Sequence, residues 1–559
     1  MNFFFYFYNS KLCLASFKNF FKIYGLKTIY VEGCSVSTKD LYVRKASGLV
    51  RAMGAFDAMN LNVSMCSPPQ GVLWAWTYGP AMIMAVNLAL SYFLGIWVIL
   101  VSGALLYVLW MMAIPRSGGD YVWFSRAIHP SFGFAVNWFF SFVFLNWYAM
   151  NLQTMGPFWL SPIFYSLGWV ELAEWASSWT GSVIIGTLFN IAFVILLIQG
   201  IAFYSKAWKY LFFVVLAGSV AYALILYTTP QSLFIERFNA ISSLKYDEVV
   251  KIAQDIGGWL PGWTLAGVLL GLVFPLQNYN WAGFPAYVAG EIRRVERSAW
   301  IGIVGGLVTM GLWYTLLGNS IYHIAGRDFH HALAWLYNNV PDKYPLPIPP
   351  YPQTYLWILF PEAVWLQATV GFLWFLSNVY LTPPNLLITS RNMFAWAFDR
   401  IMPVRLTKVN EKGSPVYTVI VCAIIGNLIM LFVATATYQV MIMNTFIVMM
   451  IVLGLVGLAS AVFPIVKKHM YEMFPEHVKI SIAGYPLLSL AGILTAIVAF
   501  WGAYSMASAP ALGGLSFASL IFNIAILLAS IPVFLAAYYY NKTKLGLDIT
   551  LLFKEIPPG

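Results

Sequence analysis

Apolar runs of about twenty residues recur along the chain, and they constrain its fold more than any other feature. A helix needs about this many apolar residues to cross the hydrocarbon core of a bilayer. The pattern predicts an all-α integral membrane protein with about twelve transmembrane helices. The expected spans are 54–77, 80–114, 131–152, 181–200, 208–227, 263–289, 300–324, 363–390, 416–436, 440–466, 482–505 and 515–541.

The composition agrees with this interpretation. Only 9% of the 559 residues are charged and 60% are hydrophobic, with a mean hydropathy of +0.75. Soluble domains carry about 25% charged residues, so this chain lacks the charge to cover a water-facing surface of its own. Alternating strands of about ten residues are absent from the sequence, which excludes an outer-membrane barrel.

Positive charges are distributed unevenly between alternate loops. With the amino terminus placed in the cytoplasm, five of the 31 Lys and Arg residues fall outside and the remaining 26 inside. The positive-inside rule therefore predicts a multi-pass plasma-membrane protein with both termini cytoplasmic. The net charge of +10 follows this topology and does not indicate a nucleic-acid partner. The five outer residues are Arg237, Lys245, Lys251, Arg327 and Lys343.

Two of the expected spans contain residues that break helices. Residues 60–71 read NLNVSMCSPPQG, and residues 273–287 read VFPLQNYNWAGFPAY. Proline removes a backbone donor, and broken helix is tolerated in a bilayer only where it is buried in protein or lines a cavity. Two interrupted segments five spans apart indicate an inverted-repeat transporter with a site at the bilayer midplane. The alternative is a pair of proline kinks supported by neighbouring helices.

The distribution of charged residues limits the class of ligand that such a site could bind. No Lys or Arg falls in the middle of an expected span, the acidic residues lie at span ends or in loops, and the histidines do the same. Without a fixed ionic partner, the ends of broken helices remain to bind charge, the amino end an anion and the carbonyl end a cation. This favours a small zwitterion.

Motifs of other protein classes are missing from the sequence. There is no HExxH, Walker A or GxSxG sequence, and the cysteines Cys13, Cys34, Cys66 and Cys422 lack zinc spacing. We therefore expect neither an enzyme nor an ATP-driven pump, and no metal or cofactor beyond a coupling ion.

Three loop segments resemble a known family. PRSGGDYVWFSRAIHP at 115–130, AGEIRRVERSAWIG at 289–302 and ITSRNMFAWAFDRIMP at 388–403 are similar to loops of the amino acid–polyamine–organocation (APC) superfamily permeases. The resemblance covers the chain from about Ala46 onward. It implies a LeuT-like 5+5 inverted repeat, at 54–227 and 263–466, with helices 1 and 6 broken and two extra helices at 482–541.

The resemblance also implies a substrate site. The substrate carboxylate would meet the first break and its ammonium group the carbonyls of the second, with Tyr279 and Trp281 shaping the side-chain pocket. Ser-Pro-Pro and Pro-x-x-Asn-Tyr-Asn replace the family's usual glycine-rich and Phe-x-Gly breaks, which leaves open a substrate other than an ordinary α-amino acid. The expected binding residues are Ser64, Cys66, Ser67, Pro68, Gly71, Leu276, Gln277, Asn278, Tyr279 and Trp281.

Two further groups of residues are candidates for ion coupling and gating. Hydroxyls of Ser377 and Thr382 could join carbonyls of the first span in a sodium site, although such hydroxyls more often serve helix packing. H⁺ and Na⁺ both remain open as coupling ions. Arg116, Asp120, Glu291 and Arg293 are candidates for a cytoplasmic gate, with Glu291 paired to Arg293 or Arg294; static anchoring of loops is the alternative.

The expected function is secondary active transport of amino acids or similar small zwitterionic solutes by alternating access, as a symporter or an antiporter. The alternative is a membrane sensor with a transporter fold that binds such a solute without net flux. The lipid bilayer is the expected surrounding, and the oligomeric state is left open.

Three regions are expected along the chain: a cytoplasmic segment at 1–45, the transporter domain at 46–541 and a cytoplasmic tail at 542–559. The first 35 residues are rich in Phe, Tyr and Lys but hold no run long enough to span, and a signal peptide fits poorly. We expect the natural chain to begin near Val36, with the leader a start-site artefact. An interfacial amphipathic helix is the alternative.

Overall fold

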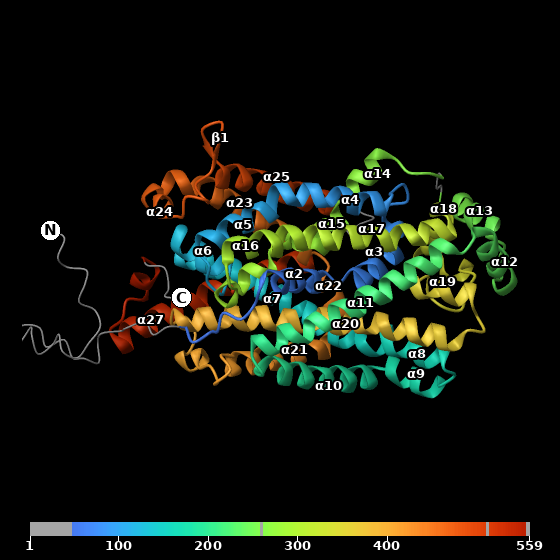
Figure 1. The fold of residues 1–559 in the computed structure, drawn as a ribbon, viewed down its shortest axis with the longest axis horizontal. Helices are drawn as coiled ribbons and strands as arrows, with labels where there is room; N and C mark the ends of the chain where they lie inside the picture. Colours follow the sequence, from blue (N-terminus) through green and yellow to red (C-terminus); the bar gives the residue numbers. More distant parts are fainter. Residues whose placement is uncertain (1–46, 258–260, 510–513, 555–559) are drawn as a thin grey trace, which may run out of the picture. The chain divides into compact units, whose positions relative to one another are not determined.

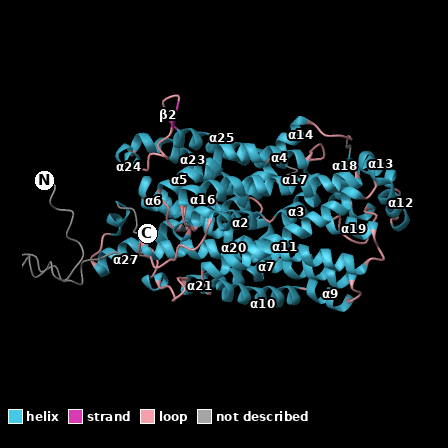
Figure 2. Ribbon diagram, viewed as in Figure 1, coloured by secondary structure: helices cyan, strands magenta, loops and turns pink. Residues whose placement is uncertain are grey.

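The computed structural model describes residues 47–257, 261–509 and 514–554. The expected amino-terminal segment, with its two alternative interpretations, lies outside these residues. Figures 1 and 2 show an almost entirely helical chain whose long helices run side by side. The described strands form one two-stranded hairpin, β1 (Ser481–Ile482) and β2 (Tyr485–Pro486), with Ser481 opposite Pro486.

The first half of the described chain is built from α-helices joined by short turns. Two π-helical segments, η1 (Leu100–Ala104) and η2 (Met155–Leu160), interrupt or extend them. The α-helices are α2 (Ala55–Cys66), α3 (Pro68–Met82), α4 (Leu88–Ile99), α5 (Leu105–Ala113), α6 (Asp120–Ala127), α7 (Pro130–Thr154), α8 (Ser161–Ser166), α9 (Val170–Ser177), α10 (Trp179–Ile198), α11 (Ile201–Thr228), α12 (Gln231–Ile241) and α13 (Tyr246–Gly257).

The second half contains more irregular helix. Its α-helices are α14 (Leu265–Leu270), α15 (Val273–Tyr279), α16 (Val295–Ala299), α17 (Gly306–Ala325), α18 (Arg327–Asn339), α19 (Pro352–Leu359), α20 (Val364–Phe398), α21 (Val416–Val433), α22 (Ala436–Ile442), α23 (Thr445–Val466), α24 (Lys468–Glu472), α25 (Leu487–Ser508), α26 (Phe517–Leu528) and α27 (Ser530–Leu545). Shorter pieces are η3 (Asn280–Ala282), η4 (Phe284–Tyr287), η5 (Ala289–Glu291), η6 (Trp300–Gly305), η7 (Pro341–Lys343), η8 (Val404–Thr407) and η10 (Ile549–Lys554).

Local sequence explains where several of these helices start. Asn87, Ser178 and Thr264 each accept a hydrogen bond from a backbone N–H three residues ahead, at the starts of α4, α10 and α14. Such side chains satisfy donors that the first turn of a helix leaves free. Pro130 stands at the start of α7, where its missing N–H costs nothing.

Nine helices in the described part of the chain are long and apolar enough to cross a membrane. They correspond to nine of the expected twelve spans. The other three, expected at 54–77, 131–152 and 263–289, differ for physical reasons. The first and third are broken, so that no single piece reaches the required length. The second is α7, a helix of 25 residues whose Asn, Gln, Trp and Tyr side chains lower its hydropathy.

Both expected breaks are present. Between α2 and α3, Ser67 adopts φ 24° and ψ 86°, outside the helical region. Beyond α15, Trp281 and Ala282 have φ values of 63° and 55°, in the left-handed region that residues other than glycine rarely adopt. The segment from Asn280 to Glu291 then continues as three short 3₁₀ turns. Both helices are therefore interrupted, the first directly before Pro68 and Pro69 as predicted, and the second six residues beyond Pro275, which itself lies inside α15.

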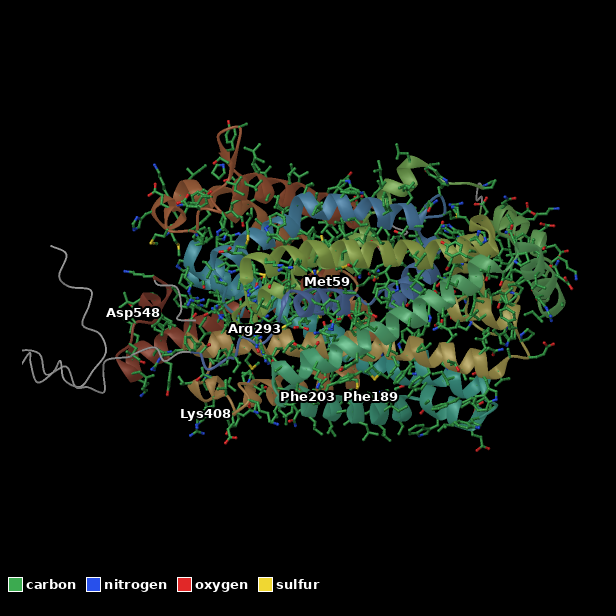
Figure 3. All side chains as sticks on the ribbon, viewed as in Figure 1. Met59, Phe189, Phe203, Arg293, Lys408 and Asp548 are labelled. Carbon is green, nitrogen blue, oxygen red and sulfur yellow. The ribbon has the colours of Figure 1, made fainter. Side chains whose placement is uncertain are left out.

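Charged and apolar side chains separate along the helices (Figure 3). Arg293, Lys408 and Asp548 lie toward one end of the helices, whereas Phe189 and Phe203 lie along their flank. Phe203 is 53% exposed, as expected for a side chain that meets lipid rather than water. We call the end formed by the loops around Arg51, Arg116, Arg293 and Lys408 the basic end. The far end carries α12, α13, α18 and α19 (Figure 1).

The longest helix, α20, organises the interior. It packs against α2, α7 and α11, and all its residues from Tyr380 to Ala397 are buried. A second tight contact joins α23 and α25, where a Cβ on Gly457 would lie 2.6 Å from the Gly492 carbonyl oxygen, and the reverse also holds. Small residues at such crossings let two backbones approach closely.

Candidate functional site

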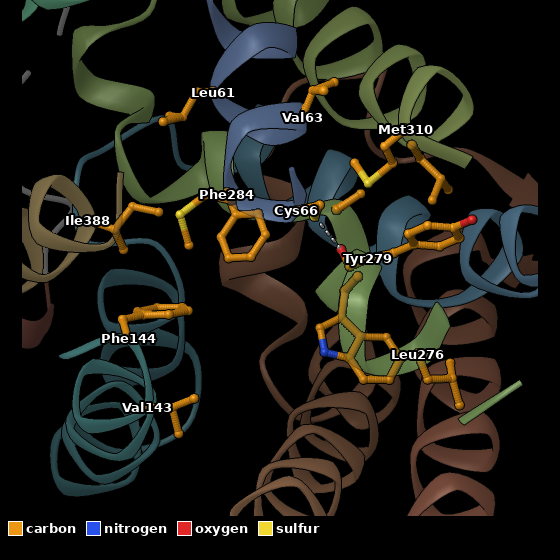
Figure 4. Close-up of a cluster of buried hydrophobic side chains, with 14 of the residues drawn as sticks. Leu61, Val63, Cys66, Val143, Phe144, Leu276, Tyr279, Phe284, Met310 and Ile388 are labelled. Atoms are coloured by element: carbon orange, nitrogen blue, oxygen red, sulfur yellow. Dashed lines mark hydrogen bonds between the residues drawn. The ribbon is translucent and has the colours of Figure 1, made fainter. Parts of the chain in front are cut away.

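The two helix breaks lie against each other. The Cys66 thiol, at the end of α2, donates to the Tyr279 carbonyl oxygen at the end of α15, with Sγ and O 3.7 Å apart (Figure 4). The Tyr314 hydroxyl of α17 donates to the Cys66 carbonyl oxygen at 2.7 Å. Each break leaves carbonyls without a helical partner, and here one such carbonyl is satisfied by a side chain from a third helix.

Gly71 makes this contact sterically feasible. A Cβ at position 71 would lie 1.7 Å from the Tyr314 hydroxyl oxygen and 2.4 Å from its ring. Only glycine therefore lets the Tyr314 ring lie across the start of α3. Gly71 belongs to the predicted binding site, but its role in the structure is to leave space for the Tyr314 ring.

The start of α3 offers few hydrogen-bond donors. Pro68 and Pro69 occupy its first two positions and have no N–H, and the Gly71 N–H already bonds to the Ser67 carbonyl oxygen at 3.1 Å. The hydroxyls of Ser64 and Ser67 donate to the carbonyl oxygens of Leu61 and Ser377. A carboxylate at this helix start would thus find fewer donors than the expected binding mode requires.

Three tyrosines close the site toward α4 and α17. The rings of Tyr92 and Tyr314 stack with centroids 4.6 Å apart, and Tyr279 meets both edge-on at 5.6 and 5.5 Å. The Asn278 side chain donates to the Tyr92 hydroxyl, and the Tyr279 hydroxyl donates to the Tyr92 carbonyl oxygen. Asn278 and Tyr279 are therefore held in an aromatic cluster rather than free to meet a ligand.

The other predicted residues of the second break have different surroundings. Leu276 is buried, and its side chain lies 3.3 Å from where a Cβ on Gly502 of α25 would stand. The buried Trp281 ring packs on Gly103 of η1. Gln277 is exposed, although it lies in the middle of an apolar segment, because it lines a cavity.

Buried charges gather at the basic end. Glu291 accepts two hydrogen bonds from Arg391, at 2.8 and 3.0 Å, and both side chains are at most 1% exposed. Arg126 pairs with Asp399 at 2.6 Å. The expected partners of Glu291, Arg293 and Arg294, do not pair with it: the Arg293 guanidinium donates instead to the Arg51 carbonyl oxygen. Arg391 replaces them because α20 brings its side chain directly over η5.

Asp120 belongs to the same end of the molecule. It accepts hydrogen bonds from the Asn137 amide at 2.6 Å and the Tyr287 hydroxyl at 3.2 Å. Burial raises the pKa of the Asp120 carboxyl to about 7, against the opposing effect of these donors. Arg116 donates to the Pro115 carbonyl oxygen. Two buried ion pairs, Glu291–Arg391 and Arg126–Asp399, and the hydrogen bonds of Asp120 thus connect α6, α7, η5 and α20 at this end of the molecule.

Residues 77–530 match the family model described as amino acid permease. The chain belongs to the amino acid permease family. A short segment of 96 residues is also 31% identical to the NADH-cytochrome b5 reductase-like protein alnC of Emericella nidulans, covering 17% of this chain. The chain spans only about a fifth (21%) of that relative's length. The permease match covers most of the membrane helices, so the protein is a multi-pass transporter-family protein in the APC superfamily and not an enzyme.

One group of site residues in this permease was missed by sequence reasoning. The Gln70 amide donates to the Asn151 side-chain oxygen at 2.9 Å, and the Asn378 amide donates to the Asn151 carbonyl oxygen at 3.0 Å. All three residues are buried, and the side-chain oxygens of Gln70 and Asn378 have no hydrogen-bond partner among the described residues. Buried polar atoms are normally satisfied, so these two oxygens are acceptors available to a solute or to water.

Amides inside apolar spans are the signal that could have singled out these three residues individually. Gln70 stands within the SPPQG segment itself, and Asn151 and Asn378 interrupt otherwise apolar runs. The sequence alone gave no reason to group them, because they are 81 and 227 residues apart along the chain.

The candidate ion ligands of the permease lie in α20 beside the first break. The Ser377 hydroxyl donates to the Trp374 carbonyl oxygen, and the Thr382 hydroxyl donates to that of Asn378. Both bonds run back along the same helix, a common arrangement for Ser and Thr in membrane helices. Their oxygens keep lone pairs, and the bond from Ser67 to the Ser377 carbonyl ties α20 to the break.

Proposed function

We propose that this permease is a secondary active transporter that moves amino acids or similar small, net-neutral solutes across the plasma membrane by alternating access. The observation that supports this most is the contact between two interrupted helices, with Cys66 and Tyr279 at the breaks. Interrupted helices at membrane depth supply free backbone groups for a solute, and they are typical of transporters built from inverted repeats.

On this proposal the fold is a LeuT-like 5+5 repeat with twelve spans. The broken α2–α3 and α14–α15 segments are helices 1 and 6 of the two repeats, and α25 with α26–α27 supplies the two extra helices. The basic end faces the cytoplasm, together with both termini, because the loops at that end carry most of the Lys and Arg residues.

The buried ion pairs at the basic end act as the cytoplasmic gate. Glu291 follows the second break and Arg391 lies in α20, so that opening this end separates the two elements. Separating a buried pair is costly unless both charges regain water. Opening is therefore coupled to hydration of the pair, which a path to the cytoplasm provides.

Solute recognition at the first break differs from the arrangement that the family resemblance implies. Two prolines replace N–H donors, while the Gln70 and Asn378 oxygens offer free acceptors nearby. A group with N–H donors, such as the solute's ammonium group, suits these acceptors. The coupling ion is H⁺ or Na⁺, with Ser377 and Thr382 as candidate sodium ligands.

Uptake into proteoliposomes of the purified protein tests this function. A panel of labelled amino acids is offered under imposed H⁺ or Na⁺ gradients. Accumulation that follows one gradient is the expected result and names the coupling ion. Saturable binding without flux under any gradient would favour the sensor alternative, and no response to any amino acid would reject both.

A further inference from the structure

A cavity of about 460 Å³ lies beside the second break. Its walls come from α7, α15, α22, α23 and α25, and Gln277 of α15 belongs to the lining. Ligand pockets in proteins are typically about 300–1,000 Å³, so this cavity is large enough for a small solute. Because Asn278 and Tyr279 follow Gln277 directly, the cavity adjoins the candidate site.

The cavity is on the far-end side of the break. Its residues lie near the end of α7, between the end of α22 and the first turns of α23, and near the end of α25. α7 starts at the basic end, beside the Asp120 contacts, and its residue Met150 is near the opposite terminus. The cavity therefore lies on the route between the far end and the breaks.

The lining is apolar and adaptable. Six of its residues are Met150, Met443, Met449, Met506, Trp147 and Phe446, and none of the lining residues is charged. Methionine is flexible and polarizable, and it fits apolar ligands of different shapes. A charged group buried against such walls would lack a partner, which disfavours it strongly.

Most of the polar lining is already engaged. The Asn146 side-chain oxygen accepts from the Tyr438 hydroxyl, and the Thr445 hydroxyl donates to the Asn523 side-chain oxygen at 2.9 Å. Gln277, by contrast, is exposed and makes no side-chain hydrogen bond to any other described residue. The cavity thus combines apolar walls with one free carboxamide, next to the helix break.

We propose that this cavity receives the side chain of a bulky, apolar amino acid, with the free Gln277 carboxamide lying in its wall beside the helix break. The inference rests on the proposed transport function and names its substrate class. Neutral amino acids of the size of Leu, Met or Phe are then preferred to Gly and Ala, and to Lys and Glu, whose side-chain charge the walls cannot compensate.

Competition for uptake tests the preference. Proteoliposomes take up labelled alanine in the presence of unlabelled Gly, Ala, Val, Leu, Met, Phe, Lys or Glu. Inhibition should strengthen by about fourfold for each methylene group that the cavity buries. Inhibition that does not depend on side-chain size, or is strongest for Lys or Glu, would overturn the inference while leaving the transport function intact. Absence of uptake for alanine and for every member of the labelled panel described above would instead reject the proposed function.

A matched pair of variants tests whether the preference for large apolar side chains arises at this cavity. Met443 lines the cavity and is 42% exposed, whereas Met473 is 60% exposed and lies outside it. Met443→Trp should fill the cavity and weaken inhibition by Leu, Met and Phe at least tenfold, with inhibition by Gly and Ala retained. Met473→Trp should behave like the unsubstituted protein. Equal behaviour of the two variants would overturn the inference.

An enlarging variant covers the case in which Met443→Trp fails to fold. Met449→Ala removes a buried part of the wall. It should strengthen inhibition by Phe relative to Leu, because the larger ring gains room. An unchanged ratio of Phe to Leu inhibition, in protein that elutes as a single species, would count against the cavity as the side-chain site.

Discussion

Single residues of this permease derive their roles from side chains on distant helices. Gly71 stands where Tyr314 of α17 crosses the start of α3. Glu291 and Arg391 satisfy each other across 100 positions of sequence. In both cases the residue is understood only with its partner, since neither a lone glycine nor a lone buried acid has a defined role in the sequence.

The contact at Gly71 predicts a specific sensitivity. Gly71→Ala places a methyl group within 1.7 Å of the Tyr314 hydroxyl oxygen, so the ring must move and lose its bond to Cys66. Overpacking of this kind costs about 1–3 kcal/mol. Thermal unfolding in detergent measures the loss. Gly305→Ala is the control, because its nearest neighbours stand 3.9 Å away; equal melting temperatures for the two variants would contradict the prediction.

The buried ion pair gives a second prediction at this scale. Glu291→Gln leaves the Arg391 guanidinium buried without its counter-charge, which should cost about 3–5 kcal/mol in the free energy of unfolding. The control is Glu472→Gln, because the Lys468–Glu472 pair is exposed, and such pairs contribute little. Denaturant unfolding compares the two. A similar, small effect in both variants would show that the Glu291–Arg391 pair is not a stabilising contact.

At the scale of whole elements, local sequence determines where a helix is broken, and neighbouring helices determine how its two pieces are oriented. The prolines end α2 and start α3, while Tyr314 and Ser377 fix the orientation of the two pieces. At the far end, α18 holds the other terminus of α3. Its His330 ring contacts the Trp76 carbonyl oxygen at 3.0 Å, and its Asn338 amide donates to that of Thr77 at 2.9 Å.

Removing the prolines should therefore change the site more than the fold. The double substitution of Pro68 and Pro69 by Ala restores two N–H groups and permits a continuous helix through the break. We expect solute affinity to fall at least tenfold, with membrane insertion retained. Pro464→Ala, within α23 and away from the breaks, is the control and should leave affinity unchanged. Wild-type affinity in the double variant would reduce the Ser-Pro-Pro segment to a kink.

The histidines of α18 predict a dependence on pH. Burial lowers the pKa of His330 to about 3 and that of His331 well below its ordinary value, with the nearby Arg327 charge acting in the same direction. The folded protein thus holds both rings neutral, whereas unfolded histidine titrates near about 6.5. The contribution of these two histidines to the free energy of unfolding is fully present above that pH. It is lost progressively as the pH falls from about 6.5 toward 3.

The measurement is the melting temperature between pH 8 and pH 5. We expect it to fall as the solution is acidified, and the fall should be smaller in His330→Gln. His469→Gln is the control, because His469 is exposed on α24. A pH profile that is the same for all three proteins would contradict a role for the buried rings.

At the scale of the whole molecule, apolar flanks and charged ends define how the protein lies in a bilayer. Leu188 and Phe203 are exposed apolar side chains of α10 and α11, and Figure 3 shows Phe203 on the flank of the helices, with Arg293 and Lys408 toward the basic end. This separation is what a membrane imposes, because lipid accepts apolar side chains and excludes unpaired charge.

The orientation can be measured with a pair of matched thiols. Ser481 in the β1–β2 hairpin and Ser243 between α12 and α13 are both exposed. A maleimide that cannot cross membranes should label Ser243→Cys on intact cells and label Ser481→Cys only after permeabilisation. The unsubstituted chain gives the background. The reverse pattern would place the basic end outside the cell.

The apolar runs, the two helix breaks and the family were all accessible from the sequence. Each depends on residues close together in the chain: an apolar run spans on its own, and a proline breaks the helix that contains it. The contacts of the site were not accessible in this way. Arg391 rather than Arg293 pairs with Glu291, Tyr314 lies on Gly71, and Gln70 meets Asn151.

The physical reason is that apolar helices resemble one another on their outer faces. Hydropathy predicts that a segment crosses the membrane, yet it gives no information on which helix lies beside it. Only the packing of α7, α17 and α20 around the breaks decides which amide, phenol or carboxylate is satisfied and which is left for a solute. The sequence by itself determined a membrane protein with two broken helices, and the tertiary structure decided what surrounds the breaks.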